Sequence, residues 1–266
     1  MNKLYCTLAT VILWGSVGKA DTLSYLRFEE GSGYGAYDGT GLMNGEVLNF
    51  SDVSAGGGDT GPQGWSTNVS SATVPLTGEA NTGSMHFAGG SAFIDLSNAN
   101  ILSLGLEFTI ELFMKPDMPI TASPMFHFSP VSALSFMLGE DFGNLYFSSW
   151  FQSASTYDSA SLVQIDEWQH FALVVDSTSY AIYLNGQVQA SDSLPTGGEG
   201  PYWFSGDPTT GNRTLGDGFR GWIDEFRISD EALLPSQFLN ASIPEPGTIG
   251  LLGLGFISLM IRKRLL

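Results

Sequence analysis

Apolar and polar positions alternate most clearly just past the middle of the chain. Residues 171–175 and 180–184 form two apolar runs with a large side chain at every second position, and the polar segment Asp176–Ser179 separates them. This period of two predicts a β-hairpin. Asn185–Gly186 then supplies the two positive-φ positions of a type I′ turn, so the chain is expected to reverse again into Gln187–Ala190. The segment therefore predicts three adjacent antiparallel strands, and its two-sided apolar character favours a two-layer sandwich.

Shorter runs of the same kind recur along the chain, separated by turn-forming residues. The runs at 85–87 and 92–96 are expected to pair as a hairpin, whereas the polar, Gly-rich segments 31–64 and 195–218 are expected to be long loops with one short strand in the first. Residues 230–239 are expected to form one or two helical turns, with Ser229 or Asp230 as N-cap. Strands are predicted at 23–28, 47–50, 85–87, 92–96, 108–114, 125–128, 134–138 and 145–151.

The two ends of the chain have patterns of their own. Residues 1–20 combine Lys3, an apolar stretch and small residues before Asp21, which predicts a secretory signal peptide rather than a buried helix. The single cysteine, Cys6, lies in that segment, so no disulfide framework is expected after its removal. Near the other end, the apolar run 247–261 is shorter than the roughly 20 residues that span a bilayer.

Charge narrows the possible partners. The chain has 27 acidic and 10 basic residues, giving a net charge of −17. A surface of this kind repels nucleic acid and anionic lipid and attracts divalent cations, so no nucleic-acid partner is expected. The acidity also has a simpler explanation, because excess carboxylates keep an exported protein soluble.

Three sets of residues resemble the laminin-G-like, concanavalin A-like jelly-roll family. The resemblance implies an all-β fold over residues 21–242, a two-sheet antiparallel jelly-roll sandwich. The matching residues are an opening segment at Leu26–Gly33 with Asp38–Gly41, a central set of Trp168, His170, Tyr183 and Asn185–Gly186, and a last strand Phe219–Ile228 of the form F-x-G-x-I-D-E-x-R-I.

Residues 243–266 resemble the PEP-CTERM sorting signal of Gram-negative envelope proteins. The resemblance implies that an exosortase recognises this segment at the inner membrane and cleaves near its Pro-Glu-Pro motif, which sends the protein to the outer surface or the extracellular matrix. The alternative is a plain C-terminal membrane anchor, whose basic end would stay inside the cell. The residues that carry the resemblance are Pro244, Glu245, Pro246, Arg262, Lys263 and Arg264.

A calcium ion is the cofactor that the laminin-G-like resemblance implies. In that family an ion often joins the opening loop to the last strand, and the matching positions are Asp38, Asn44 and Asp224. Calcium takes about six to eight oxygen ligands, which these side chains and nearby carbonyl groups could supply. The alternative is that Asp38 forms an Asx-turn and Asp224 caps a loop.

Sugar binding is the second candidate, because aromatic faces beside polar groups are the usual composition of such sites. Several aromatic residues fall in expected loops or strand ends, where the alternative is that they close the ends of the sandwich. The residues we expect to bind a sugar are Trp150, Tyr202, Trp203 and Phe204, and Trp65 and Tyr157 are further candidates.

Hydrolysis is the third candidate, and the sequence argues against it. A retaining glycosidase needs two carboxylates about 5 Å apart, but neighbours such as Asp224 and Glu225 face opposite sides of a strand. His86, His127 and His170 lie on separate expected strands without metal-binding spacing. We therefore expect a non-enzymatic, exported protein that binds glycan or exopolysaccharide; the alternatives are a glycan-active hydrolase or lyase and a structural or adhesive module.

Overall fold

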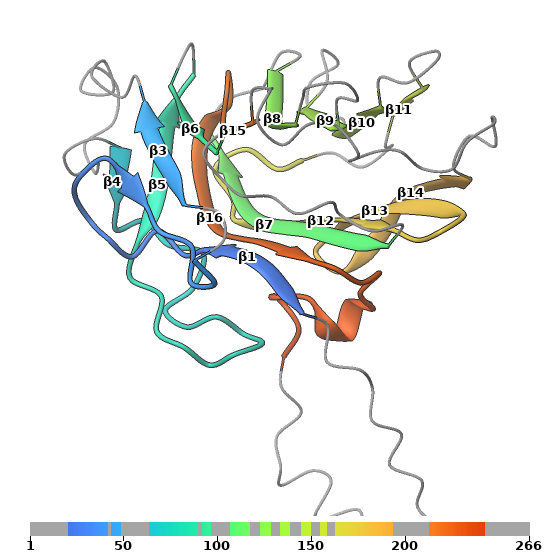
Figure 1. Ribbon diagram of the computed structural model, residues 1–266, viewed down its shortest axis with the longest axis horizontal. Helices are drawn as coiled ribbons and strands as arrows, with labels where there is room; N and C mark the ends of the chain where they lie inside the picture. The colour runs from blue at the N-terminus through green and yellow to red at the C-terminus, as the bar shows by residue number, and fades with distance from the viewer. Residues whose placement is uncertain are drawn as a thin grey trace, which may run out of the picture.

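Two antiparallel β-sheets form the body of the protein and lie in separate layers (Figure 1). A computed structural model describes residues 21–41, 44–48, 64–89, 92–96, 107–117, 123–128, 134–138, 145–149, 155–158, 163–193 and 213–242.

The first sheet, sheet A, contains the first and last strands of the described chain side by side. Its order is β14-β13-β12-β7-β16-β5-β4, and β1 also pairs with β16 (Figure 1). The chain ends of this sheet are joined further by a hydrogen bond from Asp21 N to Asp230 Oδ1 at 2.9 Å. Its strands are β1 (Thr22–Leu26), β4 (Trp65–Ser66), β5 (Ser84–Ala88), β7 (Phe108–Pro116), β12 (Gln169–Val175), β13 (Ser179–Leu184), β14 (Gln187–Ser193) and β16 (Arg220–Ser229).

The second sheet, sheet B, has the order β11-β10-β9-β8-β15-β6-β3-β2, so that β2 is an edge strand. Its strands are β2 (Gly35–Ala36), β3 (Gly45–Leu48), β6 (Phe93–Asp95), β8 (Ser123–Phe128), β9 (Leu134–Leu138), β10 (Leu145–Ser149), β11 (Ser155–Asp158) and β15 (Arg213–Leu215). The two-sheet antiparallel sandwich expected from the sequence is confirmed.

The central three-stranded prediction is also confirmed. Strands β12 and β13 pair with Phe171 opposite Leu184 and Val175 opposite Tyr180. Asn185 and Gly186 have φ values of 51° and 76°, as the type I′ turn requires. Strand β14 then pairs with β13 and continues to Ser193, three residues past the expected end.

The hydrophobic core lies between the two sheets. Alternate residues of β7, among them Ile110 and Met114, project into it from sheet A, and Ile94 and Leu215 project from sheet B. All four side chains are at most 1% exposed. Since alternate strand residues face opposite sides, the intervening residues of each strand lie on the outer faces of the sandwich.

Three local predictions were wrong. The segments at 85–87 and 92–96 are strands but not a hairpin, because β5 pairs with β4 and β16 in sheet A while β6 pairs with β3 and β15 in sheet B. The chain crosses between the layers there, which local periodicity does not reveal. Strand β15 lies within the expected loop 195–218, and it is too short to show a period.

The third correction concerns only the N-cap, because one helical turn does lie within residues 230–239 as predicted. The only helix there is a 3-10 turn at Pro235–Gln237 with Leu234 as N-cap, whereas Ser229 is the last residue of β16. Pro235 cannot donate a backbone hydrogen bond, so it favours the first turn of a helix over a strand.

Within the described part of the chain, no helix has the length and hydropathy needed to cross a bilayer.

Candidate functional site

The outer face of sheet A carries a buried charge network. Glu111 on β7 is 0% exposed, and its carboxylate accepts hydrogen bonds from Arg227 Nε at 2.7 Å and from the backbone N–H of Leu239 at 2.8 Å. His170 Nε2 lies 2.7 Å from the same carboxylate. Burial opposes ionisation of Glu111, but the His170 hydrogen bond and the Arg227 charge outweigh it and lower its pKa. The network fastens the C-terminal segment to the sheet, and its partners are all within the protein.

Asp224, one of the expected calcium ligands, lies on β16 next to this network. It is 0% exposed, and its Oδ2 accepts hydrogen bonds from Asn81 Nδ2 at 2.8 Å and from Ser70 N at 3.0 Å. Burial raises the pKa of Asp224 to about 7, and the charge of Glu225 adds to the rise. Asp224 Oδ1 and Asn81 Oδ1 have no hydrogen-bond partner among the residues that the structure describes.

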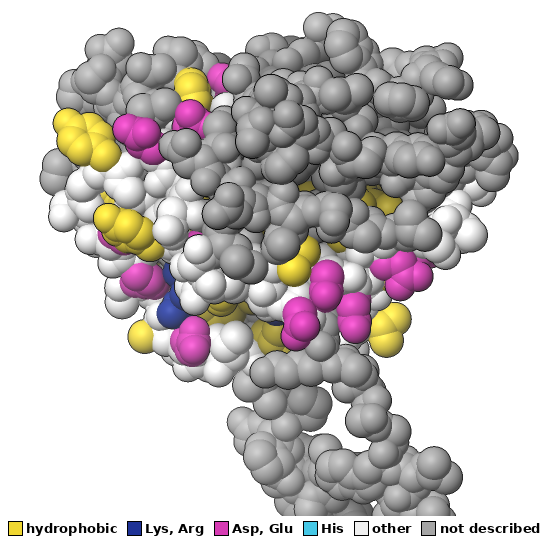
Figure 2. All heavy atoms as spheres, viewed as in Figure 1, with side chains coloured by type: hydrophobic (Ala, Val, Ile, Leu, Met, Phe, Trp, Pro, Cys, Tyr) yellow, Lys and Arg dark blue, Asp and Glu magenta, His cyan; other side chains and the backbone are white. Residues whose placement is uncertain are grey.

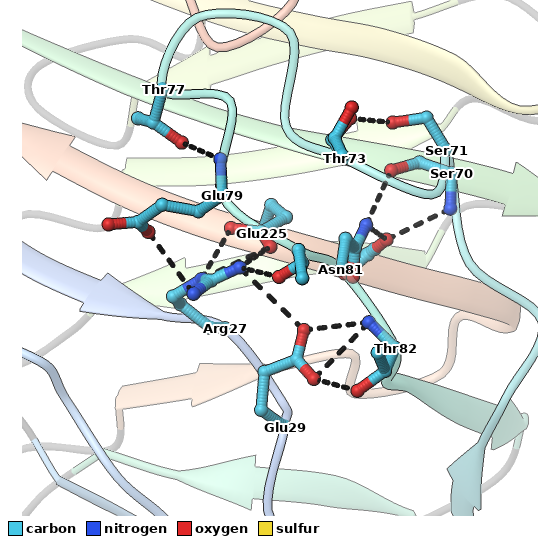
Figure 3. Close-up of polar contacts among 12 residues, drawn as sticks. Arg27, Glu29, Ser70, Ser71, Thr73, Thr77, Glu79, Asn81, Thr82 and Glu225 are labelled. Carbon is cyan, nitrogen blue, oxygen red and sulfur yellow. Dashed lines mark hydrogen bonds and ion pairs between the residues drawn. The ribbon is translucent and has the colours of Figure 1, made fainter.

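Glu225 follows at a β-bulge, where the register of β16 against β7 shifts between Asp224 and Arg227 and Glu225 takes a φ of 53°. The bulge interrupts the strict alternation assumed from the sequence. Arg27 pairs with Glu225 at 3.1 Å and with Glu79 at 3.1 Å (Figure 3). Asp224 and Glu225 are both fully buried, so neither carboxylate is placed to reach a substrate.

Figure 3 shows what this cluster holds in place. Arg27 also donates to the carbonyl oxygen of Ala80 at 2.6 Å, and Glu29 accepts a hydrogen bond from Thr82 N at 2.9 Å. Together with Asn81, these contacts fasten the segment 68–82 over β16. The cluster is therefore a structural staple between segments that are distant in sequence.

Asp38 and Asn44, the other expected calcium ligands, do come together. Asp38 N donates to Asn44 Oδ1 at 2.8 Å, and Asp38 Oδ1 accepts from Tyr25 N at 2.7 Å and Thr40 N at 2.9 Å. These are the contacts of an Asx-turn. The three oxygens of Asp38 Oδ1, Asp38 Oδ2 and Asn44 Oδ1 are thus already acceptors, and Asp224 has other partners, which fits a calcium shell poorly. In the described ranges, no three His, Cys, Asp or Glu residues gather in a way that could hold a metal ion.

The aromatic candidates have different outcomes. Trp65 is 1% exposed and donates its indole N–H to Gly33 O at 3.2 Å, so it closes the sandwich rather than binding a ligand. Tyr157 lies in β11. The other expected sugar-binding residues and the sorting residues lie outside the described ranges: Trp150, Tyr202, Trp203, Phe204, Pro244, Glu245, Pro246, Arg262, Lys263 and Arg264.

An exposed aromatic residue that sequence reasoning missed lies at the edge of sheet B. Tyr37 is 63% exposed, and its ring covers Gly35 on the side where a side chain would project. A Cβ atom at Gly35 would lie 2.9 Å from Cζ and Oη of Tyr37, so the ring occupies the space that a side chain at this position would take. The backbone N–H of Tyr37 donates to Glu30 Oε1 at 2.7 Å. The backbone of Tyr37 is therefore anchored, and its ring lies over Gly35.

Glu46 is the neighbour of this ring. It lies directly opposite Gly35 on β3, and its side chain is exposed. Directly opposite residues of an antiparallel pair project to the same face, so the Glu46 carboxylate and the Tyr37 ring share one face at the edge of sheet B. A second tyrosine, Tyr34, precedes β2 and is 67% exposed. Gly35 and Tyr37 are two residues apart, which is the spacing of residues on one face of a strand. This was the only sequence signal for their contact, and it lies in a segment that we interpreted as loop.

Acidic residues outnumber basic ones in the chain, 27 to 10. Figure 2 shows Asp and Glu side chains dispersed over one face of the molecule, with hydrophobic side chains lying singly among them.

More than half of the chain matches a known protein family. Residues 88–237 match the family model of the concanavalin A-like lectin/glucanases superfamily. The chain belongs to this superfamily. Residues 242–264 match the PEP-CTERM protein-sorting motif, which marks an exported protein that is sorted to the cell envelope and processed by an exosortase. No curated protein sequence matches the chain.

Solved structures with the same fold come from varied proteins. Domain 4 of AbnA, a GH43 extracellular arabinanase from Geobacillus stearothermophilus in complex with arabinotriose, aligns with a TM-score of 0.55 and 22% identity over 82% of this chain and 96% of that one. A Trypanosoma rangeli sialidase mutant displaying trans-sialidase activity aligns with a TM-score of 0.54 and 12% identity, over 83% of this chain and 32% of that one. The binding domain of Paraclostridial Mosquitocidal Protein 1 aligns with a TM-score of 0.51 and 13% identity, over 81% of this chain and 50% of that one. At these identities the likeness shows the fold alone.

Proposed function

We propose that this protein is a non-enzymatic envelope or matrix protein whose sandwich binds glycan or exopolysaccharide. In this proposal residues 1–20 are removed as a signal peptide, and an exosortase cleaves near Pro244–Pro246 at the inner membrane of a Gram-negative cell. The folded domain is then released to the outer surface or the extracellular matrix.

The observation that carries the binding role is the exposed ring of Tyr37 beside Glu46. A flat aromatic face stacks on the apolar face of a sugar ring, and a carboxylate accepts hydrogen bonds from sugar hydroxyl groups. The ring of Tyr37 lies over Gly35, and a tyrosine side chain has only two rotatable χ angles, so little conformational entropy is lost on binding. The arabinotriose bound to AbnA domain 4 lends support by analogy of fold.

We propose that the protein is not a catalyst because the acidic residues of its candidate sites are either buried or lack a second carboxylate beside them. Glu111, Asp224 and Glu225 are fully buried and held by internal partners, and Tyr37 and Glu46 offer a single carboxylate. A retaining or inverting glycosidase needs two carboxylates that flank the scissile bond.

The test is affinity electrophoresis of the full-length protein, purified in mild detergent, through gels that contain one polysaccharide each. We expect retardation by at least one polysaccharide, a loss of about tenfold in affinity for Tyr37→Ala and near-complete retention for Tyr37→Phe, because phenylalanine keeps the stacking face. Release of reducing sugar from any retained polysaccharide would show that the protein is an enzyme. Equal retardation of Tyr37→Ala and the unaltered protein would remove Tyr37 from the site.

A further inference from the structure

The C-terminal segment of the described chain, residues 230–242, is fastened to the outer face of sheet A, and we call it the strap. Leu239 donates its backbone N–H to Glu111 Oε2 at 2.8 Å, and its carbonyl oxygen accepts from Leu76 N at 3.0 Å. Phe238 and Leu239 are both 0% exposed. The strap lies on the side of sheet A that faces away from sheet B (Figure 1). The end of the folded domain is therefore fixed at Leu239.

The sorting motif begins a short distance beyond this fixed point. Four residues, 240–243, separate Leu239 from Pro244. A chain spans at most about 3.6 Å per residue, so Pro244 stays within about 18 Å of Leu239. A folded domain of about 100 residues already has a radius of gyration of about 13 Å. An enzyme that encloses the motif on both sides of its cleavage point therefore comes into contact with the strap.

Release of the strap would give such an enzyme more room, but the contacts of the strap oppose it. Detachment of Leu239 removes a hydrogen bond from the buried carboxylate of Glu111. Arg227 Nη2 donates to the carbonyl oxygen of Gln237 at 2.8 Å, and this bond would be lost as well. Phe238 and Leu239 would be exposed to water. Loss of a partner from a buried charge and exposure of apolar area are both unfavourable, so the enzyme meets the strap in its folded position.

The exposed side of the strap has the composition of an interface. Residues 232–243 contain no charged side chain, although the chain has 27 acidic residues. Leu234 is 64% exposed, and Pro235 and Ser236 beside it are also exposed. The backbone N–H of Leu234 donates to Gln237 Oε1 at 2.8 Å, which holds this turn in shape. The cores of protein interfaces are depleted of charged residues, so this surface is suited to another protein.

We infer that the exposed side of the strap is a docking surface for the exosortase, with Leu234 as its apolar contact. This inference rests on the exosortase processing proposed above and adds a second contact to the motif itself. The partner is a membrane-embedded peptidase, and the contact is non-covalent. An apolar side chain that is exposed in the free protein gains favourable free energy when a partner removes it from water. The folded domain thereby contributes to recognition of its own sorting tail.

The experiment follows processing of the full-length protein by pulse-chase labelling in Gram-negative cells that contain an exosortase. Gel mobility separates the two forms, and mass spectrometry locates the cleavage. We expect Leu234→Glu to slow processing about fivefold, because a charge replaces the apolar contact, whereas Leu234→Met keeps an apolar side chain and should retain the rate. The matched control is Val188→Glu. It changes another exposed apolar residue, on edge strand β14, and should alter the rate less than about twofold.

The stability of the variants separates docking from folding. The Leu234 side chain is exposed, and any residue at this position supplies the backbone N–H that Gln237 accepts. Leu234→Glu should therefore lower the melting temperature of the purified protein by no more than about 2 °C.

A linker variant tests whether the short distance matters. Insertion of about 12 Gly and Ser residues between Ser242 and Ile243 adds a root-mean-square reach of about 20 Å, so the enzyme holds the motif without touching the strap. With the linker present, Leu234→Glu and the unaltered strap should be processed at rates within about twofold of each other.

The outcomes separate the inference from the processing on which it rests. If Leu234→Glu is processed as fast as Val188→Glu, the strap is not a docking surface, and exosortase processing stands. If Leu234→Glu is slowed equally with and without the linker, Leu234 does not act by contact beside the motif, and the inference fails. Absence of cleavage near Pro244, in cells that process another protein with a PEP-CTERM motif, would overturn both.

Discussion

The polar residues on the outer faces of the two sheets differ in solvent exposure. On sheet A, Glu111, His170 and Arg227 are at most 9% exposed and bind one another beneath the C-terminal segment. On sheet B, Tyr37 is 63% exposed and Glu46 is exposed beside it at the edge of the sheet. The polar groups of the first face are used for the fold, whereas Tyr37 and Glu46 on the second are exposed to solvent.

This difference shows why residue type is a poor guide to function in a sandwich. A histidine, a glutamate and an arginine on adjacent strands have the composition of a catalytic site, yet here their bonds fasten a terminal segment. A buried ion pair contributes little net stability over an apolar replacement, but removal of one partner leaves the other charge uncompensated. Substitutions on the outer face of sheet A should therefore lower the stability of the protein, whereas substitutions on the outer face of sheet B should lower its affinity for a ligand.

The largest effect is expected at Glu111. Glu111→Ala removes the acceptor of Arg227, His170 and Leu239 N at once, so we expect a loss of about 3–5 kcal/mol in the free energy of unfolding. Urea denaturation followed by tryptophan fluorescence measures it. The matched change on sheet B, Glu46→Ala, should alter stability by less than about 0.5 kcal/mol. Equal losses at the two positions would contradict the comparison.

The second effect is a pH dependence that belongs to sheet A. The pKa of Asp224 is raised from 3.8 to about 7, so between these values the folded protein holds a proton that the unfolded chain has released. The stabilising contribution is complete below pH about 4 and is lost as the pH rises through about 7, and it amounts to at most about 4 kcal/mol. The pKa of Glu225, raised by burial and lowered in part by Arg27, shifts in the same direction.

Asp224→Asn tests that assignment, because an amide keeps the shape of the protonated acid and cannot ionise. We expect its unfolding midpoint to fall less than that of the unaltered protein between pH 5 and pH 8, measured by thermal denaturation. A slope as steep in the variant as in the unaltered protein would place the titrating group elsewhere. Glycan affinity, which depends on sheet B, should not follow this slope.

The third effect falls on binding alone. Tyr37→Ala should weaken glycan binding about tenfold, or about 1.4 kcal/mol, and change the free energy of unfolding by less than about 0.5 kcal/mol, because the ring is exposed. Isothermal calorimetry and urea denaturation of the same preparation measure the two quantities. A loss of stability equal to the loss of binding energy would make Tyr37 part of the fold rather than of the site.

The smallest effect concerns calcium. Since Asp38 and Asn44 already accept internal hydrogen bonds, we expect millimolar calcium to raise the melting temperature by no more than about 1 °C. A larger rise that Asp224→Ala abolishes would establish the calcium site predicted from the sequence. Differential scanning fluorimetry with and without a chelator gives the answer.

Part of the site was within reach of sequence reasoning. The laminin-G-like resemblance placed Asp38, Asn44 and Asp224 on segments that the fold does bring to sheet A and its neighbouring loop, but their hydrogen-bond partners were invisible. Asp224 bonds to Asn81 and Ser70, more than 140 residues away along the chain. Tyr37 was overlooked because its segment is dense in glycine and polar residues, which indicate loop whether or not a short edge strand forms.

The sequence by itself determined the features that depend on neighbours along the chain: the β12 to β14 meander with its Asn185–Gly186 turn, the all-β class and the sorting tail. Only the tertiary structure decided that β5 and β6 belong to different sheets, that segments 68–82 and 230–242 cover sheet A, and that Glu46 stands beside Tyr37. The physical reason is that period and turn chemistry act over a few residues, whereas strand pairing and burial join residues whose separation in sequence carries no signal of their contact.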